Sequence, residues 1–243
     1  MLQNTRGIVL RSIKYGETSL ITSIFTQHFG VQTYMVQGVR SSKANNKAAL
    51  FQPASMLELV AYQKPGKNLQ RLREYQSCYF AASMQEEVVK NSTALFSVEL
   101  LLRLLPEHAP MPELFDFSYE YFKRLDQMST ADTPNFPLYF IIQSSRLLGY
   151  EVQGSYCEAT PYLNLHEGGF SAHPPVQRPL LADEDAATLA QLIKIKEITE
   201  LKEITMNGAM RFRLLDWYME YLHQHSQHLG QLKSLSVLRA ILH

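Results

Sequence analysis

The sequence has few cysteines and no long apolar run. Its 243 residues include only two cysteines, Cys78 and Cys157, which are too few and too far apart for a disulfide framework. We therefore expect a reduced, cytoplasmic protein. No segment approaches the roughly 18 uninterrupted apolar residues that a membrane span needs. Arg6 and Arg11 interrupt the first residues, where a secretion signal would need an apolar core, so we expect neither secretion nor membrane insertion.

Motifs of enzymatic chemistry are also missing. The chain has no glycine-rich phosphate loop and no GxSxG, HExxH or CxxC pattern. The nearest reactive cluster is Cys157, His166 and His173, but zinc normally takes four closely paired ligands, so we predict no metal site and no cofactor. A hydrolase or transferase that uses Cys157 and His173 is the enzymatic alternative, although this pair would need a third, orienting group. We predict that the protein is not an enzyme.

The net charge of zero hides an asymmetry. Residues 1–80 carry ten Lys or Arg and three Asp or Glu, whereas residues 81–243 carry 13 basic and 20 acidic side chains. A basic segment joined to an acidic remainder indicates that one part of the protein meets a polyanion.

The basic segment has the alternating pattern of β-strands. Val9, Arg11 and Ile13 alternate with their neighbours and are expected to share one face of the first strand. Five short strands in about 75 residues fit a small barrel, either an OB-fold or an SH3-like barrel. The cationic bias favours the OB-fold, because OB barrels bind single-stranded nucleic acid in a basic groove. The predicted strands cover about 5–13, 19–25, 31–38, 54–63 and 69–76.

Basic side chains of this predicted barrel are the candidate nucleic-acid-binding residues, since Lys and Arg neutralise phosphates. Exposed rings at Tyr15, Tyr34 and Tyr62 could stack on bases. The polar segment 41–53 is predicted to be a loop, either a mobile basic finger or a solvated connector. A Lys-Pro-Gly-Lys turn follows at 64–67 and precedes two further arginines. The candidate set is Arg11, Lys14, Arg40, Lys43, Lys47, Lys64, Lys67, Arg71 and Arg73.

Helical spacing replaces the alternating pattern from about Tyr79. Glycines and prolines interrupt it over about 150–180, where we predict a loop-rich insert with a hairpin at Tyr162–Ser171. The predicted fold is therefore α+β, with a five-stranded OB-fold domain at 1–79 and a mainly helical domain at 80–243. The predicted helices include 95–105, 112–128, 136–148, 183–194, 209–225 and 235–242.

Several sequence segments resemble a known family, the bacterial recombination mediators called RecO, in an order and spacing that span nearly the whole chain. The N-terminal segments are TRGIVLR at Thr5–Arg11, YGE at Tyr15–Glu17, FG at Phe29–Gly30, GVR at Gly38–Arg40 and YQKPGKNLQRL at Tyr62–Leu72. The C-terminal segments are SRLLGY at Ser145–Tyr150 and LKSLSVL at Leu232–Leu238.

This resemblance implies a non-enzymatic role in DNA repair and homologous recombination. Proteins of this family bind single- and double-stranded DNA and anneal complementary strands. They also bind the C-terminal tail of single-stranded DNA-binding protein (SSB) and work with RecR to load the RecA recombinase. The resemblance also implies a bacterial, nucleoid-associated protein of the cytoplasm. A general single-stranded DNA- or RNA-binding protein without mediator activity is the alternative.

The resemblance also frames two expectations for the helical half. The SSB tail is acidic and ends in an apolar residue, so its receptor would be an apolar slot with a basic rim. Many members carry a four-cysteine zinc module in the insert, but this insert holds only Cys157, so we predict no zinc there. The possible rim residues are Arg124, Arg146, Arg211, Arg213, Lys233 and Arg239.

Overall fold

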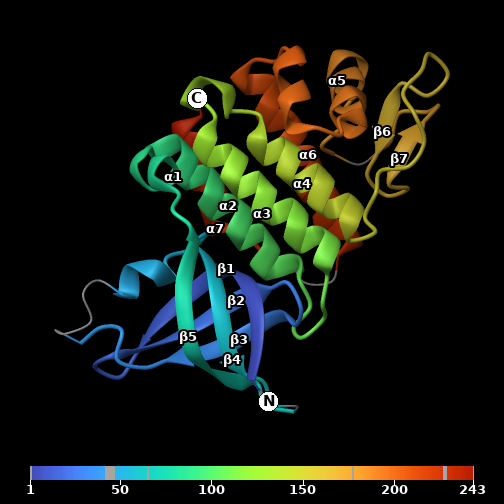
Figure 1. The fold of residues 1–243 in the computed structure, drawn as a ribbon. Helices are drawn as coiled ribbons and strands as arrows, with labels where there is room; N and C mark the ends of the chain where they lie inside the picture. Colours follow the sequence, from blue (N-terminus) through green and yellow to red (C-terminus); the bar gives the residue numbers. More distant parts are fainter. Residues whose placement is uncertain (1, 42–46, 65, 177, 227–228, 243) are drawn as a thin grey trace. The chain divides into compact units, whose positions relative to one another are not determined.

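The computed structural model describes residues 2–41, 47–64, 66–176, 178–226 and 229–242. The chain forms two compact units, and each joins segments that are distant in sequence (Figure 1). The first unit comprises Met1–Glu86 and Leu104–Gln127, and the second comprises Glu87–Arg103 and Met128–His243.

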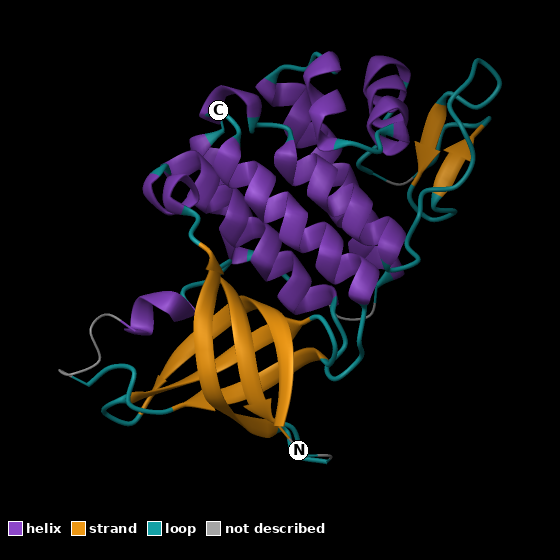
Figure 2. Cartoon of the chain, viewed as in Figure 1, coloured by secondary structure: helices purple, strands orange, loops and turns teal. Residues whose placement is uncertain are grey.

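Five strands of the first unit close into a barrel in the order β1-β2-β3-β5-β4 (Figure 2). The β3–β5 ladder is parallel, and the other ladders are antiparallel. This arrangement is consistent with an OB-fold and confirms the predicted fold class. The strands are β1 (Leu2–Tyr15), β2 (Ser19–Thr26), β3 (Gly30–Val36), β4 (Met56–Tyr62) and β5 (Leu69–Tyr79).

A short helix between β3 and β4 contributes to the barrel core. The 3₁₀ helix η1 spans Lys47–Phe51, and its Phe51 ring is buried 4.8 Å from the ring of Tyr75. The prediction of a loop throughout 41–53 is therefore wrong for η1, because burial of Phe51 anchors this segment. Other side chains of this core are Val9, Leu20, Ile24, Tyr34, Val36, Val39, Leu57, Leu59 and Ala61.

A β-bulge in β1 changes the direction in which its side chains project. Val9 pairs with Ile24, and Arg11 pairs with Ser23, so two steps along β1 match one step along β2. Leu10 is therefore an extra residue in the ladder. Val9 lies in the core, whereas Arg11 and Ile13 are exposed. The prediction that all three share a face is wrong, because one extra residue reverses the alternation.

Helix α3 (Pro112–Gln127) belongs to the first unit and packs on the barrel. Its Phe115 ring lies 5.4 Å from the Phe25 ring of β2 in an edge-to-face contact, and both rings are fully buried. Such aromatic pairs stabilise a core beyond the burial of their area. The short helix α1 (Ala82–Glu86) lies in the same unit, where Asp126 accepts a hydrogen bond from the backbone of Met84.

The second unit is helical, and α4 forms its centre. Nearly every side chain of α4 is buried, as its apolar sequence predicts. Trp217 and Tyr221 of α6 stack at 5.5 Å in its core. Within the described residues, no helix combines the length and the apolar character that a bilayer-spanning segment requires. The elements are α2 (Val88–Leu104), η2 (Thr130–Asp132), α4 (Phe136–Leu147), α5 (Asp183–Lys194), η3 (Ile198–Glu203), α6 (Gly208–His225) and α7 (Lys233–Ile241).

The insert of the second unit contains the predicted hairpin. Strands β6 (Tyr162–Asn164) and β7 (Gly169–Ser171) are antiparallel, with Tyr162 opposite Ser171. The imidazole Nε2 of His225 donates a 2.7 Å hydrogen bond to the backbone carbonyl of Leu165. This contact ties the hairpin to α6.

Candidate nucleic-acid interface

An open row of side chains crosses the outside of the barrel. Successive members are direct partners in the ladders that join β1, β2, β3, β5 and β4, and direct partners project from the same face of a sheet. Ile13 and Tyr62, at the two ends of the row, are 44% and 42% exposed. The row consists of Ile13, Ile21, Met35, Arg71 and Tyr62.

A second row runs beside the first and adds another arginine. It consists of Arg11, Ser23, Thr33 and Leu69, again as direct ladder partners. We call the two rows together the open strip. Exposed apolar and aromatic groups between two arginines suit a nucleic-acid strand, because bases stack on flat side chains while phosphates meet the charges.

Further cations lie at the margins of the open strip. Lys14 is near the end of β1, and Arg40 donates a 3.2 Å hydrogen bond from Nη1 to the Gly16 carbonyl of the β1–β2 turn. Lys64 and Lys67 belong to the β4–β5 turn, which leads into the strand that carries Arg71. The fold thus places two separate turns of the sequence beside the same row of exposed side chains.

The other candidate cations differ in their surroundings. Lys47 is exposed on η1, and Lys43 lies outside the described residues. Arg73 forms a 3.2 Å ion pair with Glu74, while Arg71 donates a 2.9 Å hydrogen bond to the Gln37 side chain. In the part of the chain that the structure describes, no hydrogen bond or ion pair engages the charged groups of Arg11, Lys14, Lys47, Lys64 and Lys67.

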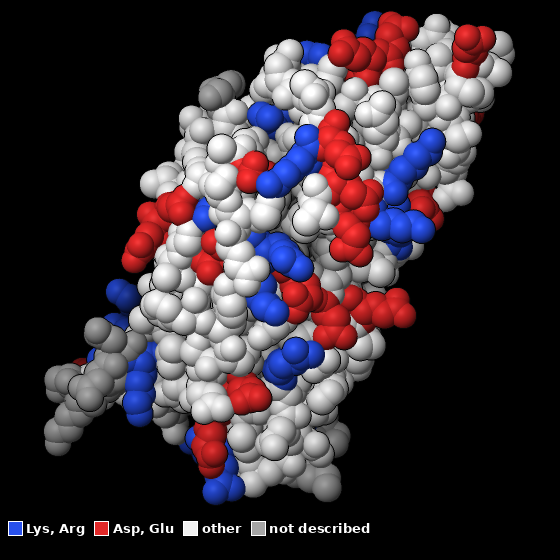
Figure 3. Space-filling view, turned by 45° about the horizontal axis from the view of Figure 1, so that its top comes forward, with Lys and Arg blue, Asp and Glu red and all other residues white. Residues whose placement is uncertain are grey.

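The acidic side chains show that charge alone does not define the interface. On the face drawn in Figure 3, Lys and Arg alternate with Asp and Glu and do not form a large patch of one sign. Whether a cation is free to contact a phosphate is therefore a better guide to the DNA-binding surface than the number of cations in its segment. A carboxylate beside a basic side chain cancels part of the attraction that this side chain exerts on a phosphate.

The three candidate tyrosines separate into two groups. Tyr15 and Tyr62 are exposed, and Tyr62 is the ladder partner of Arg71. Tyr34 is fully buried in the barrel, where its hydroxyl accepts a 3.1 Å hydrogen bond from Gln63. Burial raises the pKa of Tyr34. Tyr34 cannot stack on a base, so its prediction as a stacking residue is wrong.

A covered face on the same barrel holds a different arginine. Arg6 of β1 forms a 3.1 Å ion pair with Asp116 of α3, and its guanidinium lies 4.9 Å from the ring centre of Tyr119. Burial, followed by the hydrogen bond to Cys78, raises the pKa of Tyr119 to about 12. We call Arg6, Phe25, Phe115 and Tyr119 the covered face.

Most candidate rim residues of the helical half have partners. Arg211 donates to the Asn135 side chain, and its burial lowers its pKa. Arg213 forms a double hydrogen bond with Asp185. Arg146 bonds to the Ile193 carbonyl and Glu151, and Arg239 pairs with Asp216. Arg124 belongs to the first unit.

Lys233 and Arg239 lie together at a hollow in the second unit. The hollow measures about 880 Å³ and contains side chains from α6, from α7 and from the segment before α7. Its apolar lining includes Met219, Leu229, Leu232 and Leu235, and its acidic lining includes Asp216 and Glu220.

The structure does not assemble the cysteine and histidines of the insert into a metal site. Cys157 is exposed and shares a 3.1 Å hydrogen bond with the Thr160 hydroxyl, which lowers the pKa of the thiol. Cys157, His166 and His173 do not form a cluster. Across the described ranges, no group of three His, Cys, Asp or Glu side chains could hold a metal ion.

Sequence reasoning missed several members of the open strip. Ile21, Met35 and Leu69 were not candidates, because an apolar residue in a strand normally faces the core. The pairing of strands could have identified them. It places Met35 opposite Arg71 and Ile21 opposite Met35, in the same row of side chains. Strand periodicity places Leu69 on the same face as Arg71, but it does not place Ile21 or Met35 beside an arginine.

Comparisons with known proteins agree with this architecture. The family description "Recombination protein O N terminal" matches residues 1–80, and "Recombination protein O C terminal" matches residues 85–236. The DNA repair protein RecO of Phocaeicola vulgatus is 33% identical over 242 residues, which cover 99% of each chain. Its counterpart in Bacteroides fragilis is 32% identical over 242 residues with the same coverage. The RecO protein of Salinibacter ruber is 30% identical and covers 85% of this chain and 82% of its own. This chain therefore belongs to the RecO family.

Proposed function

We propose that this protein acts in DNA repair and homologous recombination as a non-enzymatic mediator that binds single- and double-stranded DNA and anneals complementary strands. Membership of the RecO family supports the role in repair and recombination. The open strip is the observation that supports DNA binding, because it combines the free charge of Arg11 with the exposed ring of Tyr62.

The proposed site consists of the open strip and the predicted cations at its margins. Phosphates would meet Arg11, Arg71 and the lysines of the β4–β5 turn, and bases would stack on Tyr62 or pack on Ile13. These contacts do not read base edges, so binding would be independent of sequence. A surface that neutralises two phosphate backbones lowers their repulsion and lets complementary strands pair.

We further propose that the protein acts on SSB-coated DNA and works with RecR to promote RecA loading. The hollow beside α7 is the proposed receptor for the SSB tail. Met219 and Leu235 offer apolar contacts for the last residue of the tail, and Lys233 offers a cation for its carboxylates. Arg239 contributes less charge, because it pairs with Asp216.

The test is the annealing of two complementary dye-labelled oligonucleotides coated with SSB, with and without this protein, over a series of salt concentrations. We expect acceleration that weakens as salt rises and disappears when the SSB tail is deleted. K233E should have the same effect as deletion of the tail. K194E is the matched control, since Lys194 is exposed at the end of α5 and does not line the hollow.

Binding of bare single strands without acceleration on SSB-coated strands would reject the mediator role. That result would support a general single-stranded nucleic-acid-binding protein. Acceleration that persists without the SSB tail would place the mediator activity in the barrel alone and reject the receptor.

A further inference from the structure

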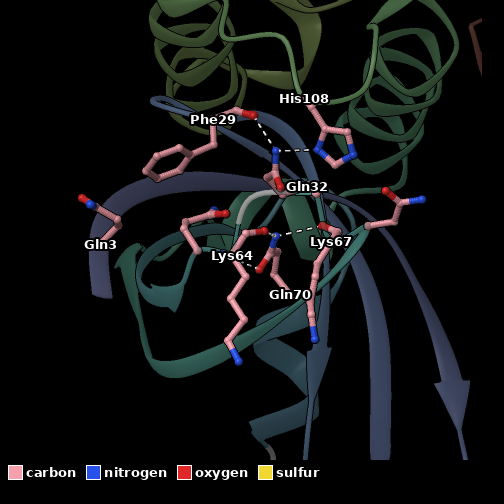
Figure 4. Close-up of a pocket in the computed structure, with 10 residues that line it drawn as sticks. Gln3, Phe29, Gln32, Lys64, Lys67, Gln70 and His108 are labelled. Atoms are coloured by element: carbon pink, nitrogen blue, oxygen red, sulfur yellow. Dashed lines mark hydrogen bonds between the residues drawn. The ribbon is translucent and has the colours of Figure 1, made fainter. Parts of the chain in front are cut away.

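A polar pocket of about 500 Å³ opens into the first unit next to the β4–β5 turn (Figure 4). It lies outside the open strip, and sequence reasoning did not identify it. Its lining is rich in amide groups and includes one aromatic ring and one imidazole. The lining residues are Gln3, Phe29, Gln32, Gln63, Lys64, Gly66, Lys67, Asn68, Gln70 and His108.

One wall of the pocket is a turn held by a buried glutamine. The Gln70 side chain, in a residue that is 4% exposed, accepts a 3.0 Å hydrogen bond from the backbone N–H of Lys64. It also donates 2.9 Å hydrogen bonds to the carbonyls of Lys64 and Lys67. The backbone of both lysines is thus fixed before any ligand binds, and Figure 4 shows both side chains extending away from the pair Gln32–His108.

The opposite wall is a histidine in an unfavourable backbone conformation. His108 has φ = 61°, which a residue with a side chain rarely adopts. Its backbone N–H donates to the Val31 carbonyl at 3.1 Å, and its Nδ1 accepts a 2.8 Å hydrogen bond from Gln32. In the neutral ring the proton therefore lies on Nε2, so this nitrogen can donate a hydrogen bond. The nearest carboxylate oxygen, Oε2 of Glu107, lies 3.9 Å from Nε2.

Close backbone packing holds this wall in place. A Cβ atom at Gly30 would lie 2.2 Å from the carbonyl oxygen of Ala109, so the chain beside His108 approaches β3 as only glycine permits. The second N–H of the Gln32 amide donates a 2.7 Å hydrogen bond to the Phe29 carbonyl. Gln32 thus links the backbone of Phe29 to the imidazole of the pocket.

The chemistry of the lining selects the class of ligand. Among the described lining residues there are two lysines and no carboxylate, which favours an anion. Amide side chains both donate and accept, as the edges of nucleobases do. The volume lies within the range of small-ligand sites. These properties together match a base with an attached phosphate.

We propose that this pocket binds one unstacked nucleotide of a DNA strand, with its base beside Phe29 and His108 and its phosphate at Lys64 and Lys67. The proposal rests on the proposed DNA-binding function. Leu69 and Arg71 of the open strip flank Gln70 on β5, so the strip and the pocket meet at the start of this strand, with Gln70 projecting from the opposite face.

The pocket would make the protein distinguish single strands from duplexes. A base must leave its pair and its stack to enter such a pocket, and that cost is smallest in a single strand. Phosphate contacts on the open strip serve both kinds of DNA. The pocket should therefore contribute to single-strand affinity alone.

The test is the ratio of affinities for a single strand and for a blunt duplex, measured by fluorescence anisotropy on the full chain. The variant F29L/H108N removes both rings, and Asn tolerates the conformation of His108 better than most residues. We expect the single-strand affinity to fall about tenfold. Duplex affinity should stay within about twofold, because the phosphate contacts remain.

A second variant protects the test against a folding defect. K64A/K67A changes only exposed side chains. We expect it to weaken binding of both DNAs, because these lysines also serve the open strip, with the larger loss on the single strand. K194A/K196A removes the same charge from the second unit and should change neither. Equal losses on both DNAs, or no loss on either, would overturn the pocket. Failure of the wild-type chain to bind any DNA would instead reject the proposed function as well.

Discussion

Arg6 and Arg11 lie on the same strand and have different fates. Arg6 is engaged by Asp116 and by two aromatic rings of α3, whereas the charge of Arg11 has no partner among the described residues. Sequence composition counts the two equally. The comparison shows that a basic strand becomes a binding surface only where the rest of the fold leaves it uncovered.

The same contrast extends to the whole of the barrel surface. On the covered face, aromatic rings and an ion pair serve stability. On the open strip, similar residue types remain accessible, with Tyr62 beside Arg71. Substitutions should therefore separate cleanly into those that change unfolding and those that change DNA binding, and four experiments test this separation.

The largest effect is expected for F115A on the covered face. Phe115 is fully buried against Phe25, and removal of a buried phenylalanine costs about 3–5 kcal/mol of unfolding free energy. Urea denaturation measures this loss. A cost below about 1 kcal/mol would show that α3 does not cover the barrel in solution.

Reversal of charge around the open strip should have the next largest effect. The variant R11E/K14E/K64E/K67E should bind DNA far more weakly, and its melting temperature should remain nearly unchanged, because exposed substitutions cost little stability. Removal of about four phosphate contacts should flatten the log–log salt dependence on single strands by roughly three units. The variant R178E/K194E/K196E/K202E reverses the same number of charges in the second unit and controls for net charge. Unchanged binding by the first variant would place the DNA elsewhere.

R6A and R11A should have opposite effects: R6A should lower stability, and R11A should lower DNA affinity. R6A should lose about 1–2 kcal/mol of stability through its ion pair and its ring contacts and should bind DNA normally. R11A should melt like the wild type and bind DNA several-fold more weakly. Each variant is the control for the other. An equal loss of DNA binding in both would show that the covered face and the open strip do not differ in function.

The smallest effect is expected at alkaline pH. Burial raises the pKa of Tyr119 to about 12 in the folded state, whereas its pKa in the unfolded chain is about 10. The contribution of Tyr119 to the free energy of unfolding is therefore complete below about pH 10. It is lost as pH rises from about 10 towards 12. The loss should be about 1 kcal/mol, less than the full value of the shift, because the positive charge of Arg6 favours the ionised ring. Y119F should not show this part of the decline in pH-dependent unfolding, and an identical decline in both proteins would contradict the assignment.

Local patterns predicted many elements well. Helix α5 begins at Asp183 and ends at Lys194, as the acidic first turn and the final lysine indicate. The five strands and the hairpin at Tyr162–Ser171 follow from alternation and turn residues. In each case the determining interactions lie within a few residues of one another.

Features that depend on distant partners were not predictable in this way. The stripe of Phe115 and Phe122 indicates an amphipathic helix but not the surface that it covers. The bulge at Leu10 leaves no mark in an unbroken apolar run. His108 and Gln32 are 76 positions apart and carry no motif, so only the fold reveals the pocket that they share.

The position of α3 in the chain has a consequence for synthesis on the ribosome. All barrel strands are complete at Tyr79, yet the helix that covers Phe25 ends at Gln127, 48 residues later. At about 5–20 residues per second, this delay lasts roughly 2–10 s. During that interval the nascent barrel displays an apolar patch. We therefore expect a chaperone near the ribosomal exit to bind this patch around Phe25 until α3 covers it.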